Sequence, residues 1–286
     1  MLSLSCSILG IQKKATSFYA GITLLNQKRL LGFEGVESYV IDIHTHVLPA
    51  LREDDGPKSA EKSLQMIKMA ANEGITGIVA TPHMLKPLPD RKAEIFKAIE
   101  SLGQNLVTLY PGTEVFADDH VLEQEHLITL GNSNYLLIEF PRAQLPQHTA
   151  DIFFDLQTRD YQCIFAHPER NGSIVEDPNR LIPFIQAGVL CQVNAGSILG
   201  RYGKESQKTA QIILEHGMAH FIASDMHSTH HRYYSLNEAI AEASKYTKNA
   251  QDLVTTNPEI ILRGDYLEPE EPKPYKKRGL WFFKRR

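Results

Sequence analysis

The sequence predicts an α/β fold, because strand-like apolar runs alternate with helix-like segments over most of the 286 residues. The runs that are rich in β-branched and other apolar residues are 38–44, 76–81, 105–110, 135–140, 162–166, 189–194 and 219–224. Amphipathic segments that end at a glycine, a common helix C-cap, lie at 60–74, 91–103, 178–188 and 205–217. Seven strands favour a closed or nearly closed barrel, with an open doubly wound sheet as the alternative.

The periodic pattern covers only part of the chain and divides it into three regions. Residues 1–37 have no strong period and are expected to form an N-terminal extension. Residues 38–265 hold all the candidate strands and are expected to form the barrel. Residues 266–286 are rich in proline and then in basic and aromatic residues, which is typical of a tail.

Charge and cysteine content exclude several classes of protein. The chain has a formal net charge of −4. Residues 273–286 carry seven Lys or Arg and no Asp or Glu, so the remaining residues have a net charge of −11. An acidic body repels polyanions, which argues against nucleic-acid binding. The sequence has no transmembrane-length apolar run, no basic segment ahead of an apolar leader and only three cysteines. We therefore expect a cytoplasmic protein.

The most informative motif is the pair His44 and His46 at the end of the first candidate strand. Residues i and i+2 of a strand point to the same face, so the two imidazoles would project side by side. Neutral imidazole is the commonest protein ligand for a transition metal. The pair therefore indicates a metal site at the end of a core strand.

Six of the seven candidate strands end in a residue type that can bind a metal. The later strands contribute His83, Glu114, Glu139, His167, Asp225 and His227. In α/β barrels the carboxyl ends of the strands hold the active site. Burying so many ionisable groups together is costly without a cation, and their number exceeds what one tetrahedral ion needs. The number of donors therefore suits two or three ions. Nitrogen and oxygen donors without thiolate favour manganese, iron or zinc.

These residues stand in a recognisable order of seven motifs. They are His-x-His, Asp-Asp-Gly, Thr-Pro-His, Gly-x-Glu, Ile-Glu-Phe, Ala-His-x-Glu-Arg and Ser-Asp-Met-His. The order resembles the PHP (polymerase and histidinol phosphatase) superfamily over about residues 39–265. It is most similar to the bacterial manganese-dependent protein-tyrosine phosphatases linked to capsule and exopolysaccharide synthesis. The resemblance implies a distorted (β/α)7 TIM-like barrel, the PHP fold.

The resemblance also implies which residues hold each ion. By matching motifs, the first ion would be held by His44, His46, Glu114 and Asp225. Glu114 would bridge to a second ion held by Glu139 and His167, and a third would sit between Asp55, His83 and His227. Here the Asp-Asp-Gly motif follows the second histidine by two residues more than in the family, so Glu53 or Asp54 could replace Asp55.

The chemistry implied is hydrolysis of phosphotyrosine by in-line attack of a metal-bound hydroxide. Arg170 and Arg232 would bind the phosphate, and Asp55 or His227 could assist the leaving group. The natural substrate would be a phosphotyrosine protein, namely a membrane-anchored tyrosine kinase. The basic tail could make peripheral contact with the membrane, or could be a solvated end.

Four other hypotheses about the function remain open from the sequence alone. A small-molecule PHP phosphoesterase such as histidinol phosphatase would share every metal ligand. An amidohydrolase also begins with His-x-His but commonly uses a carboxylated lysine where this chain has Glu139. An inactive metal-binding module would keep the ligands without turnover. A cysteine phosphatase needs Cys-x5-Arg, whereas Cys163 and Arg170 are separated by six residues.

Overall fold

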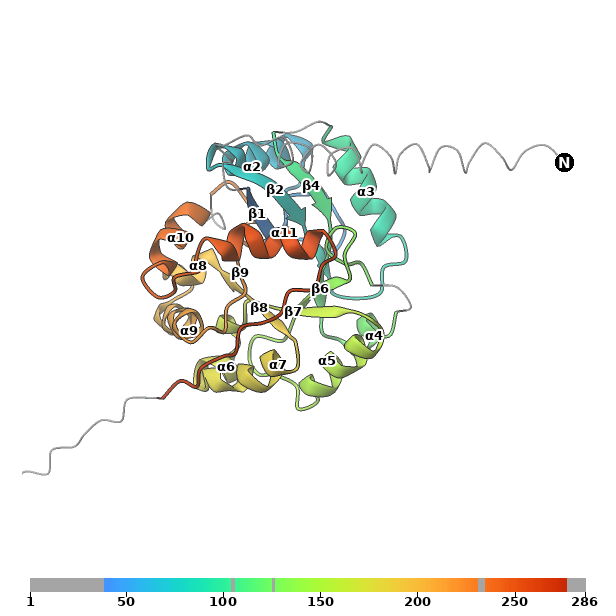
Figure 1. Ribbon diagram of the computed structural model, residues 1–286. Helices are drawn as coiled ribbons and strands as arrows, with labels where there is room; N and C mark the ends of the chain where they lie inside the picture. Colours follow the sequence, from blue (N-terminus) through green and yellow to red (C-terminus); the bar gives the residue numbers. More distant parts are fainter. Residues whose placement is uncertain (1–38, 104–105, 125–126, 231–234, 277–286) are drawn as a thin grey trace, which may run out of the picture. The chain divides into compact units, whose positions relative to one another are not determined.

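The computed structural model describes residues 39–103, 106–124, 127–230 and 235–276. Parallel strands alternate with helices along this part of the chain, and Figure 1 shows the helices arranged around the strands. The mixed α/β fold predicted from the sequence is therefore confirmed. The proposed extension 1–37, the residue Arg232 and most of the basic run 273–286 lie outside the described residues.

The strands pair in parallel in two sheets, with the orders β1-β2-β4 and β3-β5-β6-β7-β8-β9. They are β1 (Val40–Thr45), β2 (Ile75–Ala80), β3 (His83–Met84), β4 (Thr108–Pro111), β5 (Glu114–Phe116), β6 (Tyr135–Glu139), β7 (Gln162–Ala166), β8 (Leu190–Asn194) and β9 (Phe221–Ala223). The short strands β3 and β5 were not predicted separately. Each follows a longer strand after a two-residue break at 81–82 or 112–113.

The two ends of the strand series are joined by hydrogen bonds. His46 N donates to Met226 O at 2.8 Å, and Asp225 N donates to His44 O at 2.9 Å. Thr45 and Met226 form a parallel bridge. The end of β1 therefore lies beside the segment that follows β9, so residues as far as 182 positions apart in the sequence share one edge.

Most of the helices lie around the strands, and the last one crosses the middle of the view in Figure 1. The helices are α2 (Ala60–Asn72), α3 (Arg91–Ser101), α4 (Asp119–Leu122), α5 (Thr149–Thr158), α6 (Gly172–Glu176), α7 (Ile182–Gln186), α8 (Ala195–Ile198), α9 (Lys204–Glu215), α10 (Leu236–Ala243) and α11 (Thr256–Leu262). Single turns of 3-10 helix are η1 (Pro168–Arg170), η2 (Pro178–Leu181) and η3 (Asp252–Val254). The predicted helix 178–188 is divided into η2 and α7, where Pro183 removes a backbone donor.

Apolar burial between strands and helices supplies the core. Ile43, Ile78 and Leu136 on the strands are fully buried. On α2, Met66, Ile67 and Ala70 form the buried face, and Ser59 caps the helix by accepting a hydrogen bond from Lys62 N. This packing holds the strand ends in fixed positions, which the site described below requires.

The segment after α11 is held against the domain by hydrogen bonds. Tyr135 OH donates to Asp265 O at 3.1 Å and accepts from Leu267 N at 2.9 Å. Lys273 N donates to His216 O at 2.9 Å. In Figure 1 this dark red segment runs from α11 towards α6. No helix within the described residues is long and apolar enough to span a membrane.

Candidate metal centre

The carboxyl ends of the strands bring nine ionisable side chains into one cluster. The members are His44, His46, Asp55, His83, Glu114, Glu139, His167, Asp225 and His227, and their potential ligand atoms fall into four overlapping groups, each within 4.8 Å. The structure therefore brings together every predicted ligand. Two of them, His83 and Glu114, lie on the short strands β3 and β5 rather than in loops.

The first group gathers around the His-x-His pair of β1. His44 Nε2 lies 3.6 Å from Asp225 Oδ1 and His46 Nε2 lies 3.7 Å from the same oxygen. The rings of His44 and His46 are 5.4 Å apart, as expected for neighbours on one face of a strand. Asp225 follows β9 with a left-handed backbone (φ 53°), a strained conformation for a residue other than glycine.

Glu114 lies at the centre of the cluster and faces different residues with its two oxygens. Oε2 is 3.0 Å from His83 Nδ1, 3.3 Å from His44 Nε2 and 3.4 Å from His46 Nε2. Oε1 is 2.8 Å from His167 Nε2. A carboxylate in this position can bridge two ions, because the nearest nitrogen donors of its two oxygens are different.

Glu139 and His167 extend the cluster next to Glu114, and Glu139 Oε2 also lies 4.0 Å from His83 Nδ1. His167 Nε2 is 3.7 Å from Glu139 Oε1, and both side chains are largely buried. His167 also has a left-handed backbone (φ 35°) at the point where β7 turns into η1. This turn directs the imidazole back towards the cluster and begins the loop that carries Arg170.

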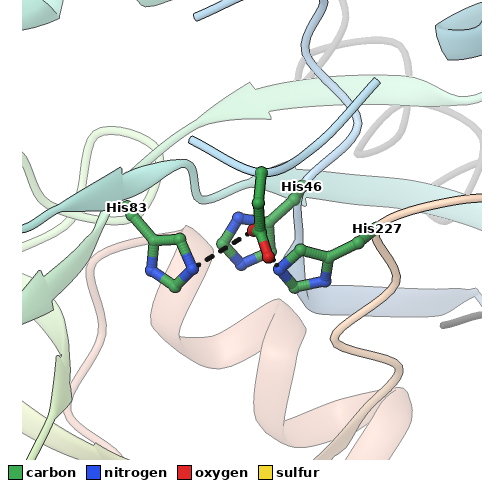
Figure 2. Close-up of side chains that lie close together, drawn as sticks. His46, His83 and His227 are labelled. Carbon is green, nitrogen blue, oxygen red and sulfur yellow. Dashed lines mark ion pairs between the residues drawn. The ribbon is translucent and has the colours of Figure 1, made fainter. Parts of the chain in front are cut away.

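A third group lies at the more open edge. Figure 2 shows the imidazoles of His46, His83 and His227 converging on one another. Asp55 Oδ1 is 2.9 Å from His227 Nε2 and 3.4 Å from His83 Nε2. The Asp55 side chain is 57% exposed, whereas His227 is 3% exposed, so this group is the part of the cluster that solvent and ligands can reach.

The lengthened loop after His46 is fixed in a way that leaves Asp55 facing the cluster. Asp54 turns inwards and accepts from His46 Nδ1 at 2.7 Å, while Glu53 turns outwards to Lys86 at 2.8 Å. A Cβ on Gly56 would lie 2.5 Å from His46 O, so only glycine permits this close approach. The two alternatives to Asp55 are thus engaged elsewhere.

Arg91 holds the same loop through hydrogen bonds to backbone oxygens. Its fully buried side chain donates from Nη2 to Arg52 O at 2.6 Å and to His83 O at 2.7 Å. One guanidinium therefore ties the lengthened loop to the strand segment that carries His83. The two extra residues are accommodated without displacing Asp55 from the histidines.

The sequence analysis missed the polar residues that support the ligands. Gln192 Oε1 lies 2.9 Å from His44 Nδ1, and Asn194 Nδ2 donates to Asp225 Oδ2 at 2.8 Å. Glu169 Oε1 accepts from Asn194 N at 3.1 Å and from Ser197 Oγ at 2.6 Å. A signal was present, because Gln192 and Asn194 alternate on β8 as the two histidines alternate on β1.

Electrostatics within the cluster favour positive charge on the imidazoles and negative charge on the carboxyls. Burial lowers the pKa of His44, but the carboxylates Glu114 and Asp225 outweigh it and raise the pKa to about 9. Burial also opposes charge on His83, yet its contacts with Asp55 and Glu114 raise the pKa to about 11. Burial raises the pKa of Glu114, but the neighbouring imidazoles hold it well below its usual range.

The cluster fits divalent cations by donor type and by spacing. It offers five imidazoles and four carboxylates, a donor set typical of transition metals rather than of calcium. Donors that hold an ion at about 2.1 Å lie roughly 3–3.5 Å apart, and the contacts of Glu114 Oε2 with three imidazoles span 3.0–3.4 Å. The residues can therefore hold more than one ion.

Arg170 lies at the edge of the cluster. Its Nη1 donates to Asp225 Oδ2 at 2.9 Å, and its guanidinium carbon lies 4.1 Å from the centre of the Tyr202 ring. The stacking orients the planar guanidinium, which carries five N–H donors. The second predicted arginine, Arg232, cannot be placed because it lies outside the described residues.

The two cysteines in the described residues are unsuited to nucleophilic catalysis. Cys163 and Cys191 are fully buried and unpaired. Burial raises the pKa of the Cys163 thiol to about 12 and that of Cys191 still further. Because the thiolate is the nucleophile, both are inert at neutral pH.

Comparisons with known proteins agree with the site. Residues 40–263 match the family described as "Capsular polysaccharide synthesis, CpsB/CapC". The tyrosine-protein phosphatase YwqE of Bacillus subtilis (strain 168) is 32% identical over 255 residues, covering 85% of this chain and 100% of the relative. The tyrosine-protein phosphatase CpsB of Streptococcus agalactiae serotype III (strain NEM316) is 29% identical over 245 residues, covering 80% and 100%.

Solved structures also include a similar metal-dependent tyrosine phosphatase. A chain from the crystal structures of YwqE from Bacillus subtilis and CpsB from Streptococcus pneumoniae, described as unique metal-dependent tyrosine phosphatases, superposes with a TM-score of 0.76 at 31% identity. The match covers 83% of this chain and 100% of that one. The phosphotriesterase homology protein of Escherichia coli, at 10% identity and a TM-score of 0.51 over 79% and 99% of the two chains, shares the fold alone. The resemblance drawn from the motifs is thus confirmed, and the chain belongs to the CpsB/CapC family of capsular polysaccharide synthesis.

Proposed function

We propose that this protein is a metal-dependent tyrosine phosphatase that hydrolyses phosphotyrosine in proteins. The observation that carries the proposal is the position of Glu114, whose Oε2 contacts His44 and His83 and whose Oε1 contacts His167, with Arg170 at the edge of the same cluster. The relatives whose whole length this chain covers are named tyrosine-protein phosphatases. A thiol mechanism is disfavoured because burial raises the pKa of both described cysteines.

The geometry supports a particular distribution of ligands. The first ion would be held by His44, His46, Glu114 and Asp225. The second would be held by Glu114, Glu139 and His167, and the third by Asp55, His83 and His227, with His46 nearby. Two donor groups, His44 with His46 and Asp225, and Asp55 with His46, His83 and His227, support the first and third sites. The second is supported by the contacts of His167 with Glu114 at 2.8 Å and with Glu139 at 3.7 Å. We propose manganese as the ion, because four carboxylates supply hard oxygens beside the five imidazoles; iron and zinc fit the same donors.

The bound ions would neutralise the phosphate dianion and lower the pKa of a coordinated water towards neutrality. The residues of the chain would then orient the substrate. Arg170 uses one N–H to hold Asp225, which leaves other donors of its planar fork for the non-bridging phosphate oxygens. Arg232 would bind the phosphate from the segment that follows His227. Asp55, whose side chain is 57% exposed, would assist the departing phenolate.

The proposed fold is a distorted (β/α)7 barrel. Its support is the set of hydrogen bonds that link β1 to the segment after β9, together with the parallel order of the remaining strands. Treating β2 with β3 and β4 with β5 as two interrupted strands gives seven positions around the barrel. All the proposed ligands would then surround one mouth, as in other α/β barrels.

The proposed physiological substrate is a membrane-anchored tyrosine kinase with phosphorylated tyrosines. The link of the family to capsular polysaccharide synthesis supports a partner in that process. The openness of the Asp55 edge supports a protein substrate, because a phosphotyrosine projecting from a chain could reach it. The basic run 273–286 would bring the enzyme close to an anionic membrane surface.

The test compares two substrates with the full-length chain. Turnover of a phosphotyrosine peptide and of histidinol phosphate would be measured with added manganese and after treatment with a chelator. We expect manganese-dependent turnover of the peptide. Glu114→Gln keeps the shape of the bridge but removes its charge and should abolish activity, whereas the exposed control Glu61→Gln on α2 should not. Turnover of histidinol phosphate alone would reassign the substrate, and no turnover of either would indicate a binding module.

A further inference from the structure

Strand β8 supplies no ionisable ligand to the cluster, yet its side chains reach it. Its sequence is Leu-Cys-Gln-Val-Asn, and Gln192 and Asn194 are fully buried on one face of the strand. Two primary amides in a strand core are costly to bury unless every polar atom has a partner. Their partners are the ligands on β1 and after β9.

The two amides form a continuous chain of hydrogen bonds between His44 and Asp225. His44 Nδ1 lies 2.9 Å from Gln192 Oε1, Gln192 Nε2 donates to Asn194 Oδ1 at 2.7 Å, and Asn194 Nδ2 donates to Asp225 Oδ2 at 2.8 Å. We refer to Gln192 and Asn194 as the amide relay. It connects residues that belong to three different strand positions.

The carboxylate at one end fixes the direction of every bond in the amide relay. Ionised Asp225 can only accept, so Asn194 must present its NH₂ group to it and its oxygen to Gln192. Gln192 must therefore donate to Asn194, which leaves its oxygen facing His44. That oxygen can only accept, so His44 must carry a hydrogen on Nδ1. When the imidazole is neutral, as it is when it binds a metal, its lone pair is then on Nε2, which faces the cluster.

The same relay orients Asp225. Asn194 and Arg170 both donate to Oδ2, at 2.8 and 2.9 Å. The other oxygen, Oδ1, faces the Nε2 atoms of His44 and His46. Asp225 can then offer one oxygen to an ion rather than two. One relay thus determines which atom of His44 and which atom of Asp225 can serve as ligands.

We propose that Gln192 and Asn194 are positioning residues that set the tautomer of His44 and the single-oxygen presentation of Asp225, and thereby raise metal affinity at the first site. This inference rests on the proposed metal-dependent function. Outer partners of metal-bound histidines typically contribute 10–100-fold to metal affinity. The relay achieves this with neutral groups, which add no further negative charge to a cluster that already holds four carboxylates.

The first test is a spectroscopic signature of the wild-type protein. The full-length chain, labelled with ¹⁵N at histidine and loaded with diamagnetic Zn²⁺, would be examined by long-range ¹H–¹⁵N NMR. We expect the resonances of His44 to show a proton on Nδ1 and zinc on Nε2. A proton on Nε2 would overturn the proposal without any variant.

The second test uses matched variants. Gln192→Met deletes both amide ends and should weaken binding of one Mn²⁺ about 10–100-fold, measured by titration calorimetry. Gln192→Glu restores an acceptor for His44 and should recover the Nδ1–H signature. Thr209→Val removes a buried hydroxyl that bonds Glu205 O on α9, distant from the relay, and should leave Mn²⁺ binding unchanged.

The outcomes separate the relay from the phosphatase proposal. Unchanged Mn²⁺ affinity and an unchanged His44 signature in Gln192→Met would refute the relay even if phosphotyrosine is hydrolysed. A second outcome is that Gln192→Met binds Mn²⁺ more weakly and the wild type shows the expected His44 signature, but the wild type hydrolyses no phosphotyrosine. That outcome would support the relay and refute the phosphatase proposal. If Gln192→Met fails to fold, Gln192→Glu and the wild-type spectrum still decide the tautomer.

Discussion

Replacing Asp54 by asparagine tests whether the buried partner of His46 is electrostatically important. Asp54 Oδ1 accepts from His46 Nδ1 at 2.7 Å and from His83 N at 3.0 Å. Asparagine has nearly the same shape but no charge. The substitution therefore removes the ion pair while leaving the loop through Gly56 sterically unchanged.

The expected magnitude follows from the pKa of Asp54. Burial raises this pKa, but His46 and the bond from His83 N outweigh burial and lower it from 3.8 to about 2. Each pKa unit corresponds to about 1.4 kcal/mol, so the ionised carboxylate should add about 2 kcal/mol to the free energy of unfolding at pH 7. Because the folded-state pKa is lowered, this contribution is present above the unfolded pKa and is lost as the pH falls through about 2.

The assay is chemical denaturation of chelator-treated protein at pH 7, 5 and 3. Asp54→Asn should lose about 2 kcal/mol at pH 7 and 5, and about half of that at pH 3. The control is Glu53→Gln, the adjacent residue on the same loop, whose carboxylate faces solvent and Lys86. Exposed pairs contribute little, so the control should match the wild type.

Metal binding supplies an independent readout for the same pair of variants. Asp54 fixes the His46 proton on Nδ1, so its loss should weaken Mn²⁺ binding about 10–100-fold. Equal stability and equal Mn²⁺ affinity of Asp54→Asn and Glu53→Gln would show that the buried contact has no special role. A loss of stability that did not diminish at low pH would show that packing, rather than charge, explains it.

Three further predictions concern the edge of the cluster. Gly56→Ala places a Cβ 2.5 Å from His46 O, so it should cost about 1–3 kcal/mol of stability and reduce bound metal by one ion, measured by elemental analysis. Arg170→Ala should lower kcat/KM about 100-fold with bound metal retained; loss of metal together with activity would contradict its role in phosphate binding. Tyr202→Leu removes the ring that supports Arg170 and should raise KM several-fold, whereas Tyr202→Phe should not.

The residues of the cluster could be predicted from the sequence because each belongs to a short local motif. His44 and His46 alternate on a strand, and Asp225 and His227 repeat the spacing after another. The carboxyl ends of parallel strands meet at one edge, so local motifs sufficed to predict a shared site. The strand positions were predictable for the same reason, since buried parallel strands are nearly continuous apolar runs.

The supporting contacts could not be predicted in this way. The alternation of Gln192 and Asn194 places them on one face of β8, but Gln192 lies 148 residues from His44 and the sequence does not indicate that the two are partners. Asp54 was considered only as a substitute ligand, because the sequence does not show which of three neighbouring acids turns inwards. The outcome depends on Gly56 and on the hydrogen bonds from Arg91, which are properties of the folded loop.

The cluster balances its own charge, and this has a consequence for metal binding. The carboxylates raise the pKa of His44 to about 9 and that of His83 to about 11, so protons on these imidazoles neutralise the carboxylates at pH 7. A cation must displace those protons, because an imidazole binds metal through its neutral form. Affinity should therefore rise with pH, and binding should release protons. The same pairing lets the carboxylates be buried together during folding, before any ion arrives, and so explains how the strand ends can be assembled in advance.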